Sequence, residues 1–328
     1  MDRPLVAVVL AGGTGTRLYP ATSTDRPKQF RSFGGDRSLL ARTVDRAGFA
    51  DETYVLTRPD YADAVHDHAP GAGVLTEPEP KDTGPALVYA AHRIREQVGD
   101  CAILALPSDH LVEGDFATTA RTAATVAVET EGLVTVGIEP TRPATGYGYI
   151  DPGPSADGYA PVERFVEKPD AETAESFLDA GYLWNAGIFA WTPAALLSAA
   201  RDSPLAPLVA ALDEGDPDRG FAAVESVSVD NAVLETADDV YVVPAGFDWD
   251  DIGSWDALGR ILDTDADGNA TLGDALAVDA TNCVLATDGQ VSVVGVEDLV
   301  VASFDGRTLV VPRDQAQRVR DVVARRRE

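Results

Sequence analysis

The chain has 328 residues and carries 54 Asp and Glu against 26 Lys and Arg, which gives a formal charge of −28. A field this negative would repel a phosphate backbone, so it argues against a general nucleic-acid binder unless one face is locally basic. Because 45% of the residues are hydrophobic, the chain can bury one large core and a smaller one and is not a disordered acidic tail. Its apolar runs are far shorter than the roughly 20 residues of a bilayer span, so we expect no membrane association.

The N-terminus and the cysteines indicate a reducing compartment. Met1 is followed within a few residues by a strand-like segment, without a basic n-region or a small-residue cleavage site. Cys101 and Cys283 are too few for a disulfide framework. We therefore expect a cytoplasmic protein.

Lysine is almost absent from the chain, since only three of the 26 basic residues are lysines. A chain so rich in carboxylates and so poor in lysine resembles proteins of salt-saturated cytoplasm, where salt screens self-repulsion and carboxylates keep the surface hydrated. We therefore hypothesise a halophilic origin. The alternative is an acidic protein with a basic partner, but such proteins usually concentrate their acids in blocks, and here they are dispersed.

Short β-branched runs alternate with longer helical patterns over the first 138 residues. This βαβ alternation predicts an α/β domain with a parallel, doubly wound, Rossmann-like sheet, whose ligands gather at the carboxyl ends of the strands. The predicted strands are Leu5–Leu10, Thr53–Thr57, Val74–Glu77, Cys101–Leu106 and Leu133–Ile138, and the predicted helices are Leu39–Ala47, Gly84–Val98 and Phe116–Glu129.

The character of the chain changes after residue 262. A turn cluster at Asp265–Asn269 is followed by short Val, Leu and Ala runs that continue to Pro312. Such a pattern predicts a small all-β region, which a few β-helix rungs would explain, and then an amphipathic helix from Arg313 to the end. We predict two domains, the α/β domain at residues 1–262 and the β-rich domain at residues 263–328.

The first predicted strand runs into a glycine-rich loop, with the sequence Gly-Gly-Thr-Gly-Thr-Arg-Leu at residues 12–18. Glycines directly after an apolar strand let backbone N–H groups approach an anion closely, and Arg17 and Lys28 would supply the cations that a polyphosphate needs. The loop is not a Walker A motif, because no Gly-Lys-Ser/Thr follows, and Leu18 stands where a Rossmann fingerprint has its third glycine. The alternative is an ordinary glycine-rich turn between a strand and a helix.

The longer stretch from Leu10 to Phe30 is more specific. It joins Gly-Gly-Thr-Gly-Thr-Arg-Leu-Tyr-Pro to Arg-Pro-Lys-Gln-Phe, and it resembles the sugar-phosphate nucleotidyltransferases, or sugar-nucleotide pyrophosphorylases. Pro-Lys-Gln-Phe at residues 27–30 resembles the guanylyltransferase branch, and the resemblance extends along nearly the whole chain. It implies a nucleotidyltransferase domain that transfers GMP from GTP to mannose 1-phosphate, with GDP-mannose and pyrophosphate as products and with Arg17, Lys28 and Lys168 as catalytic residues.

Two acidic segments offer ligands for a hard cation such as Mg²⁺. Asp109 follows the fourth predicted strand, where the carboxyl ends of the strands gather, and a second cluster at residues 248–251 offers the partner carboxylate. Chemistry alone leaves Asp248, Asp250 and Asp251 open for that second ligand, whereas the resemblance assigns the metal to Asp109 and Asp251. The alternatives are a turn or N-cap aspartate and ordinary surface charge.

Three further segments resemble the sugar pocket of the family. Lys168 carries a compact ammonium that suits a monoester phosphate, and Glu167 beside it can accept hydrogen bonds from sugar hydroxyls. The resemblance adds Gly148 and Asn185 as sugar-binding residues. In each case a turn, a core element or an exposed charge pair is the alternative, although a lysine retained in an arginine-rich chain favours a role that arginine cannot fill.

The segment Glu77–Ala86 resembles the nucleotide-binding segment of the family. Lys81 and Asp82 stand where Arg and Asn are usual and Gly84 replaces Ala, at positions where the base is expected to be read, so the identity of the base stays open. Asp230 and Glu235 match another family segment, but a structural role for them is as plausible as a functional one. The full set of nucleotide-binding residues that the resemblance implies is Leu10, Ala11, Gly12, Gly13, Gly15, Thr16, Lys81, Thr83 and Pro107.

Two rival functions remain. One is the same chemistry with another base and sugar, such as thymidylyl or uridylyl transfer to glucose 1-phosphate. The other is a non-catalytic, sugar-nucleotide-sensing regulatory subunit, which should have lost a cation or a metal carboxylate, and none is missing here. A small β appendage often mediates self-association, so any homodimer is expected to form through the C-terminal domain.

Overall fold

The computed structural model describes residues 3–327 of the chain. These residues fall into two compact units, and the chain passes from one to the other several times. Unit 1 runs to Gly12 and then comprises Val44–Pro107 and Val112–Trp249, whereas unit 2 comprises Gly13–Thr43, Ser108–Leu111 and the residues from Asp250 onward. Because neither unit is one continuous stretch, the domain boundary that we place at residue 262 stays a prediction.

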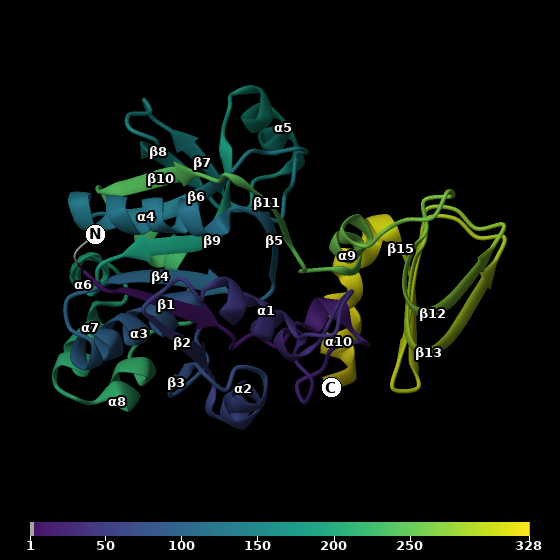
Figure 1. Ribbon diagram of the computed structural model, residues 1–328, viewed down its shortest axis with the longest axis horizontal. Helices are drawn as coiled ribbons and strands as arrows, with labels where there is room; N and C mark the ends of the chain where they lie inside the picture. Colours follow the sequence, from purple (N-terminus) through teal and green to yellow (C-terminus); the bar gives the residue numbers. More distant parts are fainter. Residues whose placement is uncertain (1–2, 328) are drawn as a thin grey trace. The chain divides into compact units, whose positions relative to one another are not determined.

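Unit 1 is built on a nine-stranded mixed sheet with the order β3-β2-β1-β4-β9-β6-β10-β8-β7 (Figure 1). Its first strand, β1, has the sequence Leu-Val-Ala-Val-Val-Leu and is buried along almost its whole length, as expected for a strand covered on both faces. The strands are β1 (Leu5–Leu10), β2 (Glu52–Thr57), β3 (Gly73–Thr76), β4 (Ala102–Pro107), β6 (Leu133–Ile138), β7 (Tyr149–Pro152), β8 (Ala160–Val166), β9 (Leu183–Trp191) and β10 (Val240–Pro244).

The parallel strands of this sheet end level with one another. Leu10, the last residue of β1, pairs with Leu56 of β2 on one side and with Pro107 of β4 on the other. The segments that follow β1 and β4 therefore leave the sheet at the same edge, as predicted for the carboxyl ends of neighbouring parallel strands.

The sheet differs from the predicted all-parallel arrangement in one respect. Strand β9 is inserted between β4 and β6 and runs antiparallel to both, and β7 and β8 add further antiparallel pairs. The sequence indicates an apolar, aromatic strand at Leu183–Trp191, but an apolar run carries no information about its direction or its neighbours.

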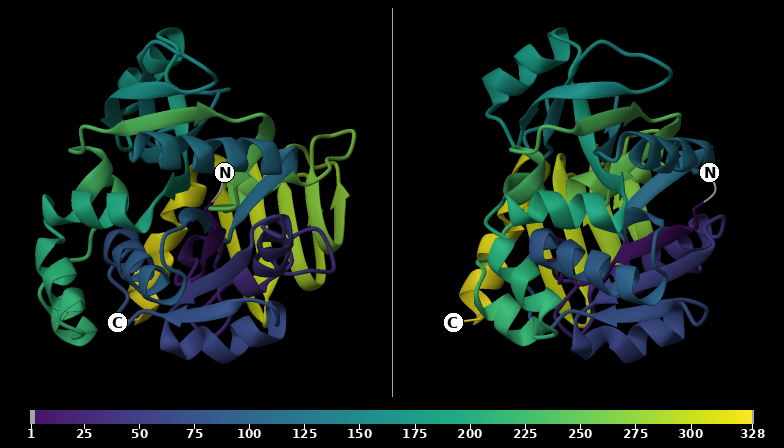
Figure 2. Two further views of the ribbon diagram at one scale, coloured as in Figure 1. Left: turned by 60° about the vertical axis from the view of Figure 1, so that its left-hand side comes forward. Right: turned by 90° about the vertical axis from the view of Figure 1, so that its left-hand side faces the viewer.

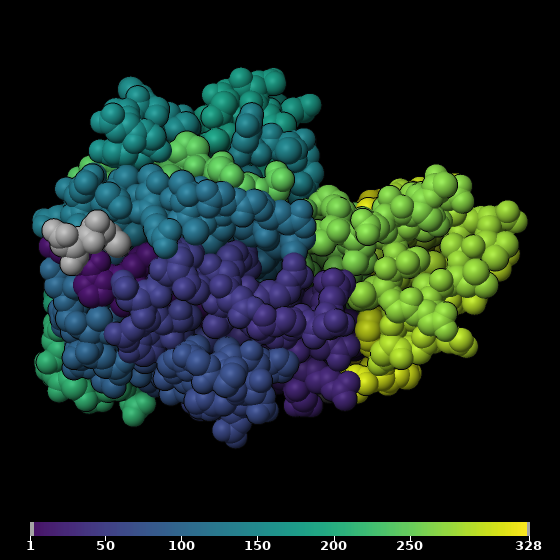
Figure 3. All heavy atoms as spheres, viewed as in Figure 1, coloured from purple at the N-terminus to yellow at the C-terminus, as the bar shows by residue number. Residues whose placement is uncertain are grey.

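Helices cover both faces of this sheet (Figures 1 and 2). One core joins the sheet to α3, α6 and α7 through buried side chains such as Leu87, Leu197 and Leu208. Helix α4 packs over β4, β6, β9 and β10, begins at the N-cap Asp115, and lies at the surface in Figure 3. The helices of the first 249 residues are α1 (Leu39–Arg46), α2 (Ala62–His68), α3 (Thr83–Gln97), α4 (Phe116–Thr130), α5 (Ala171–Asp179), α6 (Pro193–Arg201), α7 (Ala206–Asp213) and α8 (Pro217–Ala222).

Unit 2 contains the four-stranded sheet of the C-terminal region, in the order β12-β13-β14-β15. Strands β12, β13 and β14 pair in parallel with short connections, as in the rungs of a β-helix, and β15 closes the sheet in antiparallel orientation. The β-helix-like architecture predicted for this region is therefore present. The strands are β12 (Ala270–Val278), β13 (Val284–Val294), β14 (Leu299–Phe304) and β15 (Arg307–Pro312).

The sheet of unit 2 packs on helical segments that come from distant parts of the sequence. Its core joins Leu18 and Tyr19 near the N-terminus to Trp255 of α9 (Trp255–Ile261) and to Val300 of β14. The predicted C-terminal helix begins as a 3-10 turn at Arg313–Arg318 and continues as α10 (Val319–Arg327). Two short strands, β5 (His110–Gly114) and β11 (Phe247–Asp251), form a separate sheet.

Both cysteines, Cys101 and Cys283, are buried and free, in agreement with the expectation of no disulfide framework. Within residues 3–327, none of the helices is both long enough and apolar enough to cross a bilayer.

Candidate functional site

The glycine-rich loop of unit 2 is held against Lys28. Gly15 adopts a φ of +63°, and a Cβ added there would lie 2.9 Å from both Cβ and Cγ of Lys28. Thr22 Oγ1 donates a hydrogen bond of 2.6 Å to the carbonyl of Gly15, and Gln29 Nε2 donates one of 3.1 Å to the carbonyl of Gly13. Only glycine therefore fits at residue 15, for both backbone and steric reasons.

The ammonium of Lys28 forms an ion pair with the carboxylate of Asp109, and both side chains are largely buried. Burial by itself lowers the pKa of Lys28, but the carboxylates of Asp109 and Asp251 outweigh it and hold this pKa above its ordinary value. Burial by itself raises the pKa of Asp109, but Lys28 and His110 lower it to about 2. Both groups are therefore charged at neutral pH.

Asp251 is the second carboxylate of this cluster. Its pKa is raised, first by burial and also by the charge of Asp109, although Lys28 acts in the opposite direction. Its Oδ1 is buried and has no hydrogen-bond partner within the described part of the chain. Ligand atoms of Asp109, His110 and Asp251 all lie within 4.8 Å of one another.

This donor set fits a hard divalent cation. Two carboxylates with an orphaned buried oxygen are the ligands that Mg²⁺ takes in proteins, where the remaining positions go to water and to substrate phosphates. The competing aspartates are engaged or exposed: Asp250 accepts hydrogen bonds of 2.9 and 3.0 Å from Arg260, and Asp248 faces solvent. The geometry thus favours Asp251 among the three aspartates that chemistry left open.

Arg17 ends the 3-10 turn Thr16–Leu18 and is exposed. Its positive charge contributes to lowering the pKa of both Lys28 and Asp251. Arg17 therefore lies in the field of the same cluster, with its guanidinium accessible to an anion.

In unit 1, the residues at the end of β1 contact a buried glutamate that the sequence analysis did not single out. Glu77 is 5% exposed, and a Cβ added at Gly12 would lie 2.9 Å from its Oε1. Its other oxygen, Oε2, is buried without a partner among the described residues. Burial raises the pKa of Glu77 to about 7, although nearby Arg58 acts to lower it. A single glutamate between a threonine and a proline follows no motif, so the sequence carried no signal for it.

The nucleotide-binding segment of unit 1 has several internal bonds. Lys81 Nζ donates hydrogen bonds of 2.7 and 2.9 Å to the carbonyls of Phe221 and Val224 near the end of α8, and Thr83 Oγ1 accepts one from the amide of Val229. A Cβ added at Gly84 would lie 2.7 Å from the carbonyl of Val227. These contacts give Lys81 and Gly84 packing roles, and their part in nucleotide binding stays a prediction.

The predicted sugar residues of unit 1 lie together. A Cβ added at Gly148 would lie 2.6 Å from Oε2 of Glu167, and Glu167 pairs with the ammonium of Lys168. The amide of Asn185 donates to the carbonyl of Gly148, and Asn185 Nδ2 donates a hydrogen bond of 2.8 Å to Asp230. The structure thus brings the four predicted residues and Asp230 into one cluster.

Asp230 is the second residue whose role the sequence left open. Its carboxyl is nearly buried, and burial, together with the charge of Glu167, raises its pKa to about 6. Because Thr135 and the amide of Gly187 both donate to Asn185 Oδ1, the amide nitrogen of Asn185 is turned to Asp230. Asp230 therefore holds Asn185 in orientation, whereas Glu235 is exposed and accepts a hydrogen bond from Asn231.

An aromatic group accompanies the sugar cluster. The ring of Tyr147 lies 5.2 Å from that of Trp184 and 5.1 Å from that of Trp249, and the guanidinium of Arg142 lies 5.0 Å from the centre of the Trp184 ring. Flat apolar faces with nearby polar donors are typical of carbohydrate sites. The sequence marked Trp184 only as part of a segment and did not connect it to Trp249.

Comparison with families of known proteins gives two matches. The pattern described as Nucleotidyl transferase matches residues 6–268, and the pattern described as MannoseP isomerase/GMP-like beta-helix domain matches residues 273–325. The first covers more than half of the chain, and the second falls on the parallel strands of unit 2.

Individual relatives agree with this assignment. A mannose-1-phosphate guanylyltransferase of Salmonella montevideo is 35% identical, over 97% of this chain and 73% of its own length. The xanthan biosynthesis protein XanB of Xanthomonas campestris pv. campestris (strain B100) is 36% identical over 98% of this chain and 73% of its own length. A crystal structure from Thermus thermophilus, described as a mannose-1-phosphate geranyltransferase, superposes with a TM-score of 0.93 at 35% identity and covers 99% of this chain and 100% of that one.

Proposed function

The chain belongs to the nucleotidyl transferase family, and on that premise we propose that it transfers GMP from GTP to mannose 1-phosphate, with GDP-mannose and pyrophosphate as products. The observation that carries the proposal is the buried cluster of Lys28, Asp109 and Asp251 beside the glycine-rich loop. The names of similar proteins, among them two guanylyltransferases from Salmonella montevideo and Klebsiella pneumoniae, support the finer choice of substrates.

The reaction needs no nucleophile from the protein. A phosphate oxygen of the sugar 1-phosphate forms a bond to the α-phosphorus of the triphosphate, and the bond from that phosphorus to the bridging oxygen breaks as pyrophosphate leaves. Because the attacking oxygen is already anionic near neutral pH, catalysis consists mainly of alignment and charge neutralisation.

Each charged residue has a proposed part in this chemistry. Arg17, Lys28 and the loop amides would bind the phosphates of GTP, and Lys168 would hold the phosphate of the sugar. Asp109 and Asp251 would hold Mg²⁺, which when bound neutralises the negative charge that the reacting phosphates share.

Glu77 supports guanine as the base. A buried carboxylate with one unpartnered oxygen can accept hydrogen bonds from the N1–H and the 2-amino group of guanine, and neither adenine nor a pyrimidine presents that pair of donors. A base that leaves this carboxylate unpaired would be rejected, because a buried unsatisfied charge is costly.

The sugar hydroxyls would be bound by Glu167 and Asn185, with Gly148 leaving the room that a pyranose needs close to the backbone. Asn185 can both donate and accept, which matches a pair of neighbouring hydroxyls. We also propose a homodimer through the C-terminal domain, where exposed apolar residues lie on β12 and β13; light scattering of the purified chain would measure its mass. These residues are Leu276, Val278 and Val294.

The test is a substrate matrix. ATP, GTP, CTP, UTP and dTTP are each combined with mannose, glucose or N-acetylglucosamine 1-phosphate, with Mg²⁺ in molar KCl, and pyrophosphate release is measured. GTP with mannose 1-phosphate should give the highest kcat/KM. A preference for dTTP or UTP with glucose 1-phosphate would replace this proposal by the related transfer, and no release in any combination would favour a non-catalytic subunit.

A further inference from the structure

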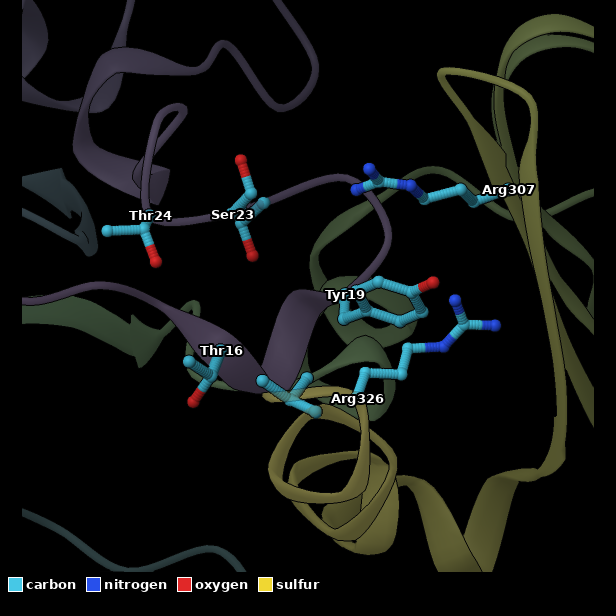
Figure 4. Close-up of a pocket in the computed structure, with 8 residues that line it drawn as sticks. Thr16, Tyr19, Ser23, Thr24, Arg307 and Arg326 are labelled. Atoms are coloured by element: carbon cyan, nitrogen blue, oxygen red, sulfur yellow. The ribbon is translucent and has the colours of Figure 1, made fainter. Parts of the chain in front are cut away.

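Unit 2 contains a second polar pocket, of about 250 Å³, near the glycine-rich loop (Figure 4). Its walls come from the 3-10 turn after the loop, from β15 and from α10. Lys28, Asp109 and Asp251 are not among its lining residues, so it is separate from the cation cluster. The residues that line it are Thr16, Tyr19, Thr22, Ser23, Thr24, Arg307, Val323 and Arg326.

Two arginines give this pocket a positive charge. Within the described residues, neither Arg307 nor Arg326 has a carboxylate within 4.0 Å, although acidic residues outnumber basic ones about two to one in this chain. Arg326 lies over the ring of Tyr19, 5.6 Å from its centre. Figure 4 shows the Tyr19 ring with the side chains of both arginines beside it.

Tyr19 provides an independent sign of a ligand. The side chain is 8% exposed, and its hydroxyl is buried without a hydrogen-bond partner in the part of the chain that the structure covers. A buried hydroxyl without a partner costs about 1–3 kcal/mol, and such a cost is expected where a ligand supplies the missing bond. The hydroxyls of Ser23 and Thr24 line the same space.

We propose that this pocket binds a phosphate monoester or inorganic phosphate and thereby regulates the glycine-rich loop. Two guanidinium groups match the geometry of a phosphate better than that of an apolar ligand, and a phenolic hydroxyl completes the set of donors. Its volume holds a small phosphorylated metabolite but not a nucleoside triphosphate.

The link to the loop is short and covalent. Thr16, which lines the pocket, directly follows Gly15, and Thr22 from the pocket wall donates its hydroxyl hydrogen to the carbonyl of Gly15. The carbonyl of Tyr19 accepts a hydrogen bond of 2.9 Å from the indole of Trp255. A ligand that moves Tyr19 or Thr22 would therefore alter the loop that precedes Arg17, and Trp255 would report the change by its fluorescence.

Direct titration tests the binding. Inorganic phosphate and glycerol 3-phosphate, neither of which is a sugar 1-phosphate or a nucleotide, are titrated into the full chain by calorimetry and by tryptophan fluorescence at one fixed KCl concentration. Saturation by either compound is expected, and the stronger of the two identifies the free ion or the ester as the ligand. If acetate binds as well as both, or if neither saturates, the proposal is overturned.

Variants locate the ligand. Arg326→Gln and Arg307→Gln should each weaken binding about tenfold, the effect of losing one charge-assisted hydrogen bond. Arg320→Gln is the matched control, because Arg320 lies on the same helix, is exposed and does not line the pocket. Equal weakening by the control would mean that only net charge matters, and the pocket would then not be the site.

Tyr19→Phe separates ligand binding from a purely structural role. Since it removes a buried hydroxyl that has no partner, the ligand-free variant should be at least as stable as the wild type while its phosphate affinity falls. A loss of stability with unchanged affinity would contradict the proposal. Binding should also persist with GTP at saturation, and competition between the two would place the phosphate in the triphosphate site instead. The direct titration does not depend on the proposed transfer reaction, so the two can fail separately.

Discussion

Lys28 determines the charge state of the two carboxylates next to it. The ion pair with Lys28 keeps Asp109 ionised, whereas the orphaned oxygen of Asp251 and its raised pKa show a carboxylate that is short of positive charge. A divalent cation would supply that charge, since nearby positive charge favours the ionised form. The neighbour Asp250, which is paired with Arg260, has no such deficit.

Replacing Asp251 by Asn should therefore reduce kcat by about 100-fold or more, the size of comparable electrostatic contributions in enzymes, and should weaken the dependence on Mg²⁺. Steady-state pyrophosphate release at several Mg²⁺ concentrations measures both effects. Asp250→Asn is the matched control and should change kcat far less. Equal losses in the two variants would show that the segment, and not the Asp251 carboxylate, is what matters.

Glu77 should make the stability of the protein depend on pH. Its pKa rises from an ordinary 4.5 to about 7 in the folded chain, first through burial, with Arg58 lowering it and Asp82 raising it. The folded state then binds the proton more tightly than the unfolded state. Its contribution to stability is fully present below about pH 4.5 and is lost as the pH rises through about 7.

The measurement is the free energy of unfolding of wild type and Glu77→Gln, by denaturant titration from pH 4.5 to 8. Relative to the variant, the wild type should lose stability by at most about 1.4 kcal/mol per pH unit and then level off above pH 7. The variant controls for all other titrating groups. A constant difference across this range would mean that burial does not shift the pKa of Glu77.

At the scale of elements, Lys81 shows how one side chain joins two segments. Its ammonium satisfies two backbone carbonyls near the end of α8, Phe221 and Val224, and so ties the segment before α3 to that helix. A cation at this position also favours the carbonyl end of a helix. The same side chain matched a nucleotide-binding motif in the sequence, because a motif records a residue type and not its partners.

Lys81→Gln should lower the free energy of unfolding by about 2 kcal/mol, since it removes a charged donor from two part-buried carbonyls. Arg93→Gln serves as the comparison, because Arg93 only forms an exposed pair with Glu96, and such pairs contribute about 0–1 kcal/mol. Urea unfolding of the three proteins decides between the alternatives. If Lys81→Gln instead leaves stability unchanged and raises the KM for GTP, the nucleotide-binding role is correct.

The end of β8 presents the second element-scale case. Lys168 follows the strand with a φ of +48° and pairs with Glu167, so the turn itself fixes where the ammonium starts. A compact ammonium at this turn suits a single phosphate, whereas a guanidinium is longer and planar.

Lys168→Ala should raise the KM for mannose 1-phosphate at least tenfold while changing the KM for GTP much less. Lys168→Arg keeps the charge and should restore only part of the loss if lysine geometry matters. Initial rates with each substrate varied in turn give both constants. Equal effects on the two substrates would remove Lys168 from the sugar-phosphate site.

At the scale of the whole molecule, the charge of −28 determines the conditions in which the protein is stable. Ion pairs use part of the arginine, as in the contacts of Arg95 and Arg201 with Asp213, but most carboxylates have no cation to pair with. Their mutual repulsion destabilises the compact state unless salt screens it.

The melting temperature should therefore rise between 0.1 and 2 M KCl. About 2 kcal/mol of relieved repulsion would raise it by roughly 5 °C. Thermal scans at pH 7.5 measure the effect, and scans at pH 4.5, where part of the carboxylates are protonated, provide the control because the salt effect should be smaller there. A melting temperature that is independent of KCl at pH 7.5 would contradict the halophilic hypothesis.

Most of the strands and helices of the first 138 residues could be predicted from the sequence, because each depends on a local pattern of apolar residues. Strand β1 has the predicted bounds Leu5–Leu10, and helix α3 begins one residue before its predicted start. The antiparallel insertion of β9 could not be predicted, because its direction depends on pairing with β4 and β6, which are far from it in sequence.

The same division holds for the candidate site. The sequence by itself determined the family motifs, the glycine-rich loop and the residue types that carry charge, since these are properties of short segments. Only the tertiary structure decided that Gly15 lies against Lys28, that Asp251 rather than Asp250 lacks a partner, and that Asp230 orients Asn185. These facts depend on burial and on contacts between residues distant in the chain, and both arise only when the chain has folded.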